Sequence, residues 1–270
     1  MAGVLSIQIN SVVGDKEANL SKVDNLIKQN SDKKLDLVVL PEFFSTNISH
    51  FDFQNSPENE NGGDVIKRLQ NLAKKYNTNI ISGSVITQEQ SKLFNTTFAI
   101  DRDGQILAKY KKIHLYNYCG GNEGALISAG DQKRVVEFDF AKVGLGICFD
   151  IRYPNFFKDL AKNGAEIFVL PTAWIMENKI FNDENLLKFE RDIFNHMAQI
   201  RAFDNACFMV VSNQAKDVNS KISSIGCSMI CDFDGRILAK ARDEECGIFA
   251  EINLLRRRNF IKDFPIFEID

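Results

Sequence analysis

The distribution of hydrophobic residues along the chain predicts buried strands and a long amphipathic helix. Leu5, Ile7 and Ile9 alternate with polar residues, which predicts a strand with one buried face. More continuous apolar runs, typical of fully buried strands, occupy residues 35–40, 143–148 and 207–212. Over residues 184–205, apolar side chains recur at the spacing of a helix packed on a sheet. The stripe expected to be buried comprises Leu186, Leu187, Phe189, Ile193, Phe194, Met197 and Ile200.

The same landmarks occur in both halves of the chain. Residues 39–41 read Val-Leu-Pro, and so do residues 169–171. Residues 101–109 and 232–240 share the pattern Asp-x-Asp-Gly-x-Ile-Leu-Ala-Lys, and the proline precedes the glycine by 63 residues in one half and 64 in the other. An Asp-Gly pair between apolar runs indicates a hairpin, because glycine accepts a positive φ. The chain is therefore predicted to contain an internal pseudo-two-fold repeat.

Each half reads as a βαβ-type unit followed by a hairpin. Two such sheets, stacked face to face with helices outside, would bury both apolar surfaces, so the predicted class is α/β. A length of 270 residues with 44% hydrophobic content fits one large core, although length alone also permits two domains. We expect a single domain over residues 1–270. Both halves would then contribute to a site at the carboxyl ends of the strands.

Three residues there have distinct chemistry. Cys148 ends an apolar run just before the chain turns away, where a thiol can meet polar groups that change its pKa. Glu42 follows another apolar run, and Lys112 lies in residues 110–115. In acyl transfer a carboxylate can take a thiol proton, while a cation stabilises the oxyanion. Structural interpretations also exist: an inert buried thiol, a capping carboxylate and a solvated basic stretch.

Three segments resemble the signature blocks of the nitrilase superfamily of carbon–nitrogen hydrolases in sequence, order and spacing. They are Pro-Glu-Phe-Phe at 41–44, Tyr-Lys-Lys-Ile-His-Leu at 110–115 and Gly-Leu-Gly-Ile-Cys-Phe-Asp-Ile-Arg-Tyr-Pro at 144–154. The resemblance implies a four-layer αββα sandwich, with Cys148 as nucleophile, Glu42 as general base and Lys112 as stabiliser of the tetrahedral intermediate. Lys112 is chosen because the family's catalytic lysine lies two residues before the histidine of the His-Leu pair.

Two further positions follow from the resemblance. Glu123 lies where the family often has a second active-site glutamate, and the alternative is an exposed loop carboxylate. The backbone N–H of Phe149 would share the oxyanion with Lys112. The implied mechanism forms a thioester on Cys148, releases ammonia or an amine, and needs no cofactor.

The substrate is expected to be a small amide. Residues 148–154 resemble the amidase branches that act on carboxylate-bearing amides, such as ω-amidases, but carbamoylases and nitrilases use the same residues. Arg152 could pair with a substrate carboxylate or form a structural ion pair with Asp150, and both interpretations remain open. Tyr118, in the loop 116–122, and Trp174, before residues 176–184, are candidates for shaping specificity.

Other kinds of function are less well supported. A Cys-His dyad would need His114 or His196, but His114 belongs to the lysine block and His196 lies on the apolar helix, where a core position is expected. Cysteine and histidine spacings give no metal site. A chain of this fold that has lost catalysis and acts as a binding or assembly module is the alternative of another class.

Charge and composition restrict the partners. A formal net charge of −3 without a sustained basic stripe argues against nucleic acid, and residues 256–258, Arg-Arg-Arg, are expected to form a solvated surface. No apolar run reaches membrane-spanning length. The six cysteines have no disulfide framework, which favours a reducing, cytoplasmic compartment.

The resemblance also concerns assembly and helix placement. Family members commonly form dimers through helices, so a homodimer or higher homo-oligomer is expected, with the helix around residues 156–161 and the C-terminal segment as its surface. Residues 201–205 resemble a family block in which Arg201 and Asp204 would fix the long helix through buried pairing.

Overall fold

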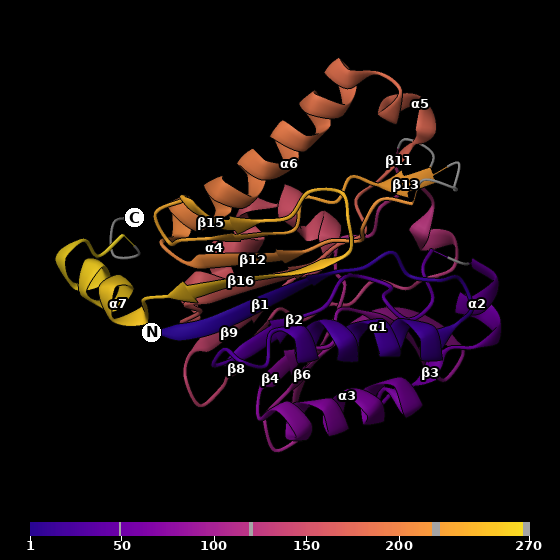
Figure 1. Ribbon diagram of the computed structural model, residues 1–270, viewed down its shortest axis with the longest axis horizontal. Helices are drawn as coiled ribbons and strands as arrows, with labels where there is room; N and C mark the ends of the chain where they lie inside the picture. The colour runs from indigo at the N-terminus through magenta and orange to yellow at the C-terminus, as the bar shows by residue number, and fades with distance from the viewer. Residues whose placement is uncertain (49, 119–120, 218–221, 267–270) are drawn as a thin grey trace.

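The fold consists of two β-sheets that face each other, with helices on both outer faces (Figure 1). The computed structural model describes residues 1–48, 50–118, 121–217 and 222–266. Helices α1 (Lys16–Gln29) and α3 (Gly63–Tyr76) cover the first sheet, while α4 (Pro154–Lys162) and α6 (Glu184–Asn205) cover the second. The predicted αββα sandwich is confirmed.

The first sheet is mixed and has the order β16-β1-β2-β4-β6-β5-β3, with β7 also paired to β6. Its strands are β1 (Ala2–Gln8), β2 (Leu37–Val39), β3 (Glu58–Asn59), β4 (Asn79–Ile81), β5 (Val85–Glu89), β6 (Lys92–Ile100), β7 (Ile106–Lys111) and β16 (Cys246–Ile252). The second sheet has the order β15-β14-β12-β10-β9-β8. It is built from β8 (Arg134–Glu137), β9 (Lys142–Leu145), β10 (Ile167–Pro171), β12 (Phe208–Ser212), β14 (Met229–Cys231) and β15 (Ile237–Lys240).

Shorter elements complete the chain. Strands β11 (Ile175–Glu177) and β13 (Ile222–Ser224) form a separate antiparallel pair. The remaining helices are α2 (His50–Asn55), α5 (Asn178–Phe181) and α7 (Leu254–Asp263), with the 3-10 helices η1 (Glu123–Ala125) and η2 (Cys148–Arg152). Both 3-10 helices hold residues that the sequence marked as chemical candidates.

The two halves repeat one strand order. Strands β1, β2 and β4 are parallel and are followed by antiparallel β6 and β7, and β9, β10, β12, β14 and β15 do the same in the second sheet. The Asp-Gly turns also match, since Asp101 N–H donates to the carbonyl of Gln105 at 2.9 Å and Asp232 N–H to that of Arg236 at 2.7 Å. The internal repeat read from the sequence therefore corresponds to a repeated chain path.

The core lies on both sides of each sheet. In β2, Leu37 and Val39 face the core between the sheets, while Val38 packs with residues of α1 and α3. Side chains of a strand alternate between faces, so a strand covered on both sides must be apolar throughout. All residues of β2 and β10 are buried accordingly.

The predicted stripe of α6 is only partly buried, and here the sequence interpretation was wrong. Phe194 is fully buried, but four stripe residues are exposed: Leu186 (45%), Phe189 (59%), Ile193 (36%) and Ile200 (48%). Ala198 and Ala202 are buried, and these small side chains let the helix approach the sheet closely. The helix therefore rests on its own sheet through a narrower face than the periodicity indicated.

The arginine triplet is only in part the solvated surface that was expected, because Arg256 and Arg258 are exposed but Arg257 is not. Arg257 is buried, and its guanidinium donates to the carbonyls of Ala206 at 2.6 Å and Ala165 at 3.2 Å. Arg258 binds the Glu166 carboxylate at 2.6 Å. These contacts fix α7 against the second half of the chain.

Two observations relate to the cytoplasmic location predicted from the sequence. Within the described ranges, Cys148, Cys207, Cys227, Cys231 and Cys246 are free thiols, and Cys119 lies outside the described residues. No helix in the part of the chain that the structure describes is long and apolar enough to span a membrane. A cytoplasmic location stays a prediction.

Candidate active site

Four side chains singled out in the sequence meet at the carboxyl ends of the central strands. Glu42 lies in the turn after β2, Lys112 directly follows β7, Glu123 opens η1 and Cys148 opens η2. The carboxyl ends of parallel strands share one edge of a sheet, which explains why residues so far apart in sequence come together. The site is assembled from both halves of the chain.

The Glu42 carboxylate is the centre of this cluster. Its Oε1 accepts hydrogen bonds from Lys112 Nζ at 2.9 Å and Asn95 Nδ2 at 2.8 Å, and Oε2 accepts from the backbone N–H of Ala173 at 2.9 Å. The Cys148 thiol interacts with the same carboxylate. Burial raises the pKa of Glu42 above its ordinary value, although the Lys112 ammonium offsets part of this effect.

The second half of the chain holds the backbone of Glu42. Its N–H donates to the carbonyl of Thr172 at 3.2 Å, and its own carbonyl accepts from Gln214 Nε2 at 2.8 Å. Gln214 in turn accepts from the Ser11 backbone at 3.1 Å. Such contacts limit the orientations available to a buried carboxylate.

Lys112 is enclosed by two carboxylates. Its ammonium lies 2.9 Å from Glu42 Oε1 and 2.8 Å from Glu123 Oε2, and its side chain is 2% exposed. Burial lowers the pKa of Lys112, but the two carboxylates raise it more, so the pKa lies well above its usual value. An ammonium that stays protonated in a buried site is suited to stabilising a developing negative charge.

Glu123 is tied to the same cluster and is not an isolated loop carboxylate. Besides the Lys112 contact, its Oε2 accepts from the Tyr116 N–H at 2.8 Å and its Oε1 from Asn95 Nδ2 at 3.1 Å. The solvent-exposed interpretation of Glu123 is therefore wrong. Its position beside Glu42 and Lys112 matches what the family resemblance implied.

Cys148 lies on a tight turn in an unusual backbone conformation. Its φ of 45° is in the left-handed region, which is costly for a residue with a Cβ. The Asp150 carboxylate accepts from the Ile147 N–H at 2.8 Å and closes the turn. Burial raises the pKa of Cys148 well above its usual range and the Glu42 charge adds to this effect, while Lys112 opposes it. A thiol with a raised pKa attacks more readily when a neighbouring base can accept its proton.

His114 is engaged elsewhere, which removes the main support for a Cys-His dyad. Its Nδ1 lies 2.6 Å from Asp150 Oδ1, and its ring stacks on Tyr153 with centroids 3.6 Å apart. The Tyr110 hydroxyl donates to the other Asp150 oxygen at 2.7 Å. His196 is exposed on α6, so the expected core position for it was wrong.

Aromatic rings surround Phe149, the residue after Cys148. The ring centroid of Phe149 lies 5.3 Å from that of Tyr116, 5.7 Å from that of Tyr118 and 5.8 Å from that of Tyr153. Tyr118 is 58% exposed, which is compatible with contact to a ligand. Residues 119 and 120 of the predicted specificity loop lie outside the described residues.

Trp174 borders the same region from the second half. The backbone N–H of Trp174 donates to Asn213 Oδ1 at 2.9 Å, and the centroid of its ring lies 5.1 Å from that of Phe194. Trp174 and Cys148 are both half-buried against the core between the sheets. The segment that follows Trp174 forms β11 and α5.

Among the described residues, Arg152 and Arg201 do not form the tight ion pairs that were considered for them. Arg152 is exposed at the end of η2 and forms no ion pair within the described ranges, so the proposed pair with Asp150 is absent there. Arg201 does not pair tightly with Asp204, because their charged atoms are 3.9 Å apart and Asp204 is half-exposed. Instead, Arg201 Nε donates to the Ile151 carbonyl at 3.1 Å and links α6 to η2, the turn that begins at Cys148.

Three contributors were missed in the sequence: Asn95, Gln214 and the backbone N–H of Ala173. Asn95 had a detectable signal, because it is an amide side chain inside the apolar segment 93–100. Gln214 had a similar signal, because it is an amide side chain just after the fully buried strand β12. A backbone N–H has no signal of its own, since every residue except proline has one.

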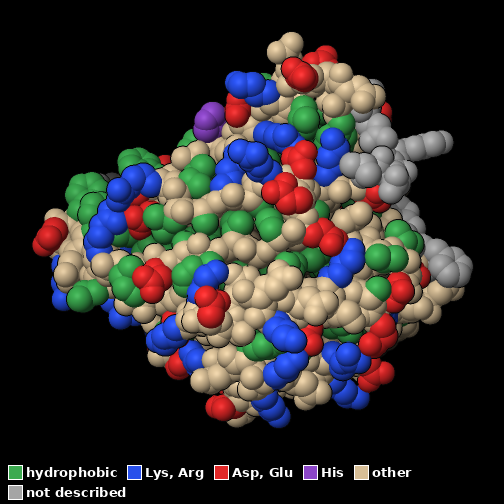
Figure 2. Space-filling model, viewed as in Figure 1, with side chains coloured by type: hydrophobic (Ala, Val, Ile, Leu, Met, Phe, Trp, Pro, Cys, Tyr) green, Lys and Arg blue, Asp and Glu red, His purple; other side chains and the backbone are tan. Residues whose placement is uncertain are grey.

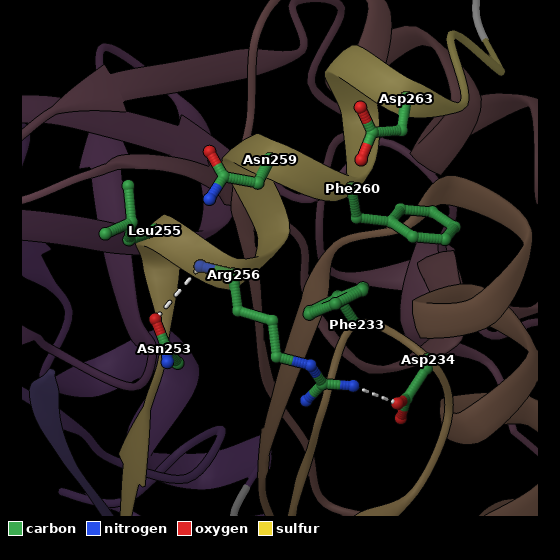
Figure 3. A pocket seen from close by; sticks show the side chains of 8 residues that line it. All are labelled: Phe233, Asp234, Asn253, Leu255, Arg256, Asn259, Phe260 and Asp263. Carbon is green, nitrogen blue, oxygen red and sulfur yellow. Dashed lines mark hydrogen bonds and ion pairs between the residues drawn. The ribbon is translucent and has the colours of Figure 1, made fainter.

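A hollow of about 540 Å³ lies elsewhere, between α7 and the turn at residues 233–234 (Figure 3). Arg256 binds Asp232 and Asp234, each at 2.6 Å, and covers the Phe233 ring at 4.6 Å. Because β16 is antiparallel to β1 and α7 follows it, the hollow lies at the opposite end of the sandwich from Cys148 (Figure 1). Its charged groups neutralise one another, and we do not place the active site there.

The fold and the cluster together define a hydrolase of carbon–nitrogen bonds other than peptide bonds. The family model for carbon-nitrogen hydrolases matches residues 4–262, and the chain belongs to this family, within the nitrilase superfamily. Among its relatives, the chain is similar to amidases of the ω-amidase type.

Individual relatives cover nearly the whole chain. The 2-oxoglutaramate amidase of Bacillus subtilis is 29% identical over 97% of this chain and 95% of its own length. Omega-amidase NIT2 of Xenopus tropicalis is 30% identical over 93% of this chain and 88% of its own.

Solved structures agree with the fold. Nit3 of Saccharomyces cerevisiae, described as a member of branch 10 of the nitrilase superfamily, superposes with a TM-score of 0.84 at 25% identity, covering 98% of this chain and 94% of its own. A carbon-nitrogen hydrolase of Helicobacter pylori G27 superposes with a TM-score of 0.88 at 23% identity, covering 100% and 94%.

Proposed function

We propose that the protein is a thiol amidohydrolase in which Glu42, Lys112 and Cys148 act together. The observation that carries this proposal is the Glu42 carboxylate, which contacts both the Lys112 ammonium and the Cys148 thiol. A base beside a thiol and a cation beside both are the parts that acyl transfer requires. The role of each residue follows from its contacts.

The reaction begins when Glu42 takes the Cys148 proton and the sulfur attacks the amide carbon. Lys112 and the backbone N–H of Phe149 stabilise the negative charge that develops on the substrate oxygen. Glu42 passes the proton on to the leaving nitrogen as the C–N bond breaks, ammonia or an amine departs, and a thioester remains on Cys148. Water activated by Glu42 or Glu123 then hydrolyses the thioester and restores the thiol. No cofactor enters this sequence.

The substrate proposed is a small amide with a carboxylate. Two considerations support it: relatives named 2-oxoglutaramate amidase and omega-amidase, and the exposed Arg152, which has no competing ion pair in the described ranges. A guanidinium binds a carboxylate through two parallel hydrogen bonds. Tyr118 and Trp174 would border the bound amide. N-carbamoyl amines and nitriles are the alternative substrates for the same residues.

Ammonia release from ω-amides, aliphatic amides, N-carbamoyl amines and nitriles tests this function, with Cys148→Ala as control. We expect release from carboxylate-bearing amides, lost in Cys148→Ala. Release from another class alone would replace the substrate proposal. Silence towards all four classes would favour a binding or assembly module.

We also propose that a second copy of the chain covers the exposed face of α6. The apolar side chains of α4 that were expected to form such a contact, Phe156, Phe157, Leu160 and Ala161, are buried within the chain itself. By contrast, Leu186, Phe189, Ile193, Ile200 and Phe203 of α6 are exposed. Grouped exposed apolar side chains commonly mark protein–protein contacts.

A further inference from the structure

Asn95 lies where the charged side chains of the site meet. It is fully buried in β6, and its side-chain nitrogen donates to Glu42 Oε1 at 2.8 Å and Glu123 Oε1 at 3.1 Å. Its backbone carbonyl accepts from the Lys112 N–H at 2.9 Å. One residue therefore contacts both carboxylates and the segment that carries the ammonium.

The two carboxylates determine which way the Asn95 amide points. The reversed amide would turn Oδ1 toward both glutamates and replace two attractive contacts with repulsion. In the orientation present, Oδ1 has no hydrogen-bond partner within the described part of the chain. A buried acceptor without a partner is unfavourable, so the amide is not optimised for the strand. The orientation of the amide is therefore determined by its hydrogen bonds to the two glutamates.

The surroundings of Glu42 show what such a donor contributes. The groups that face its carboxylate are Lys112 after β7, Glu123 of η1, Cys148 of η2 and the Ala173 N–H after β10. Lys112 is the cation shared by both glutamates. Hydrogen bonds to an ionised carboxylate favour its charged form. An amide provides one donor to each carboxylate and adds no charge.

We propose that Asn95 is a positioning residue for catalysis, which holds the carboxylates of Glu42 and Glu123 in place on either side of Lys112. Glu42 then remains able to accept the thiol proton, and the lysine remains directed at the oxyanion. This inference rests on the proposed amidase function. Asn95 contacts no reacting atom and acts through the two glutamates.

Asn95→Leu removes both donors at similar volume and tests the role. We expect kcat/KM to fall about 10- to 100-fold, as for a lost hydrogen bond to a charged group. Without the donors Glu42 is protonated more readily, so the acid limb of the pH–rate profile should move up by about one pH unit. Alkylation of Cys148 by iodoacetamide should show the same shift.

Thr97→Val is the matched control. Thr97 lies two residues further along β6, on the same face, is equally buried, and its Oγ1 has no hydrogen-bond partner in the described ranges. This variant should keep the rate and the pH profile of the unmodified protein. Asn95→Ser, whose shorter hydroxyl cannot donate to both carboxylates, should reproduce the shift seen with leucine.

The outcomes separate this inference from the proposed function. Full activity in Glu42→Gln would reject the function itself. An inactive Glu42→Gln together with an unshifted acid limb in folded Asn95→Leu would reject only the role of Asn95. Failure of both Asn95 variants to fold, while Thr97→Val folds, would assign Asn95 to the fold and overturn the proposal.

Discussion

Helices α3 and α6 occupy equivalent places in the two halves, yet their outer faces differ. Gln70 of α3 donates to the carbonyl of Gly104 at 2.6 Å, and Gln199 of α6 donates to that of Gly235 at 2.9 Å. Each glutamine thus binds the Asp-Gly turn of its own half. This shared contact aligns the two helices residue by residue.

From this alignment, polar residues of α3 correspond to apolar residues of α6. The pairs lie six residues before, one after and four after the glutamine: Asp64 with Ile193, Asn71 with Ile200 and Lys74 with Phe203, all of them exposed. At these positions the outer face of α3 is polar, whereas the outer face of α6 exposes apolar side chains to solvent. Figure 2 shows a further group of hydrophobic side chains at the end where α7 lies. Leu255 and Phe260 of α7 are among the exposed apolar residues.

The strand ends differ in the same way. After Pro41 the first half places Glu42 against the thiol, while after Pro171 the second half places Thr172, whose hydroxyl donates to the Ser212 carbonyl at 3.2 Å. The repeated chain path supplies the same turn twice. The residue on it determines whether the turn serves chemistry or only the fold.

Separate substitutions of the two turn residues, Glu42 and Thr172, should give the largest difference in activity between the halves. Glu42→Gln removes the base and should lower kcat about 100- to 10,000-fold. Thr172→Val removes one hydroxyl hydrogen bond and should cost about 1 kcal/mol of stability, with kcat changed little. Steady-state ammonia release and urea unfolding measure both. Equal losses of activity in the two variants would contradict the difference between the halves.

A charge on α6 should separate the copies, while the same charge on α3 should not. Ile200→Lys places an ammonium in the proposed contact and should weaken association about tenfold or more. Asn71→Lys is its matched control on α3. Light scattering over a range of concentrations would report the mass. A monomeric unmodified protein, or dissociation by Asn71→Lys alone, would contradict the assignment.

The two turn glycines should differ by the smallest amount. Both have a positive φ, 75° for Gly104 and 83° for Gly235, so alanine costs about 1–2 kcal/mol at either. A Cβ on Gly104 would lie 2.8 Å from the Gln70 carbonyl oxygen, but one on Gly235 would lie 3.2 Å from that of Gln199. Gly104→Ala should therefore lower the free energy of unfolding more than Gly235→Ala, as denaturant titration can measure. The reverse order would show that the first turn relaxes more easily.

The sandwich and its repeat could be predicted because their signals are local and occur twice. Apolar runs mark the strands, and the paired Asp-Gly turns mark the hairpins. The chemical residues came from the family resemblance, and the structure brings Glu42, Lys112, Glu123 and Cys148 into contact as expected. The long-range order of the chain was therefore accessible without coordinates.

The remaining features depend on contacts that a sequence pattern does not specify. Periodicity predicted an amphipathic α6 but could not tell which apolar residues face its own sheet. Arg257 looked solvated because its partners are the backbone carbonyls of Ala206 and Ala165, which any residues could supply. The Ala173 N–H likewise leaves no signal in the sequence, because every residue except proline has such a group. Arg152 is the opposite case, since the sequence offered Asp150 as a partner but the structure shows no ion pair of Arg152 in the described ranges.

The contact between Ala173 and Glu42 has a practical consequence. Glu42, Lys112 and Glu123 precede the exposed residues 131–133, while Cys148 and Ala173 follow them. A chain divided there would leave the proposed base and cation on one fragment and the proposed nucleophile on the other. Ammonia production would then report only on reassembly, so the divided protein could serve as a split-enzyme sensor for partners fused to the two fragments.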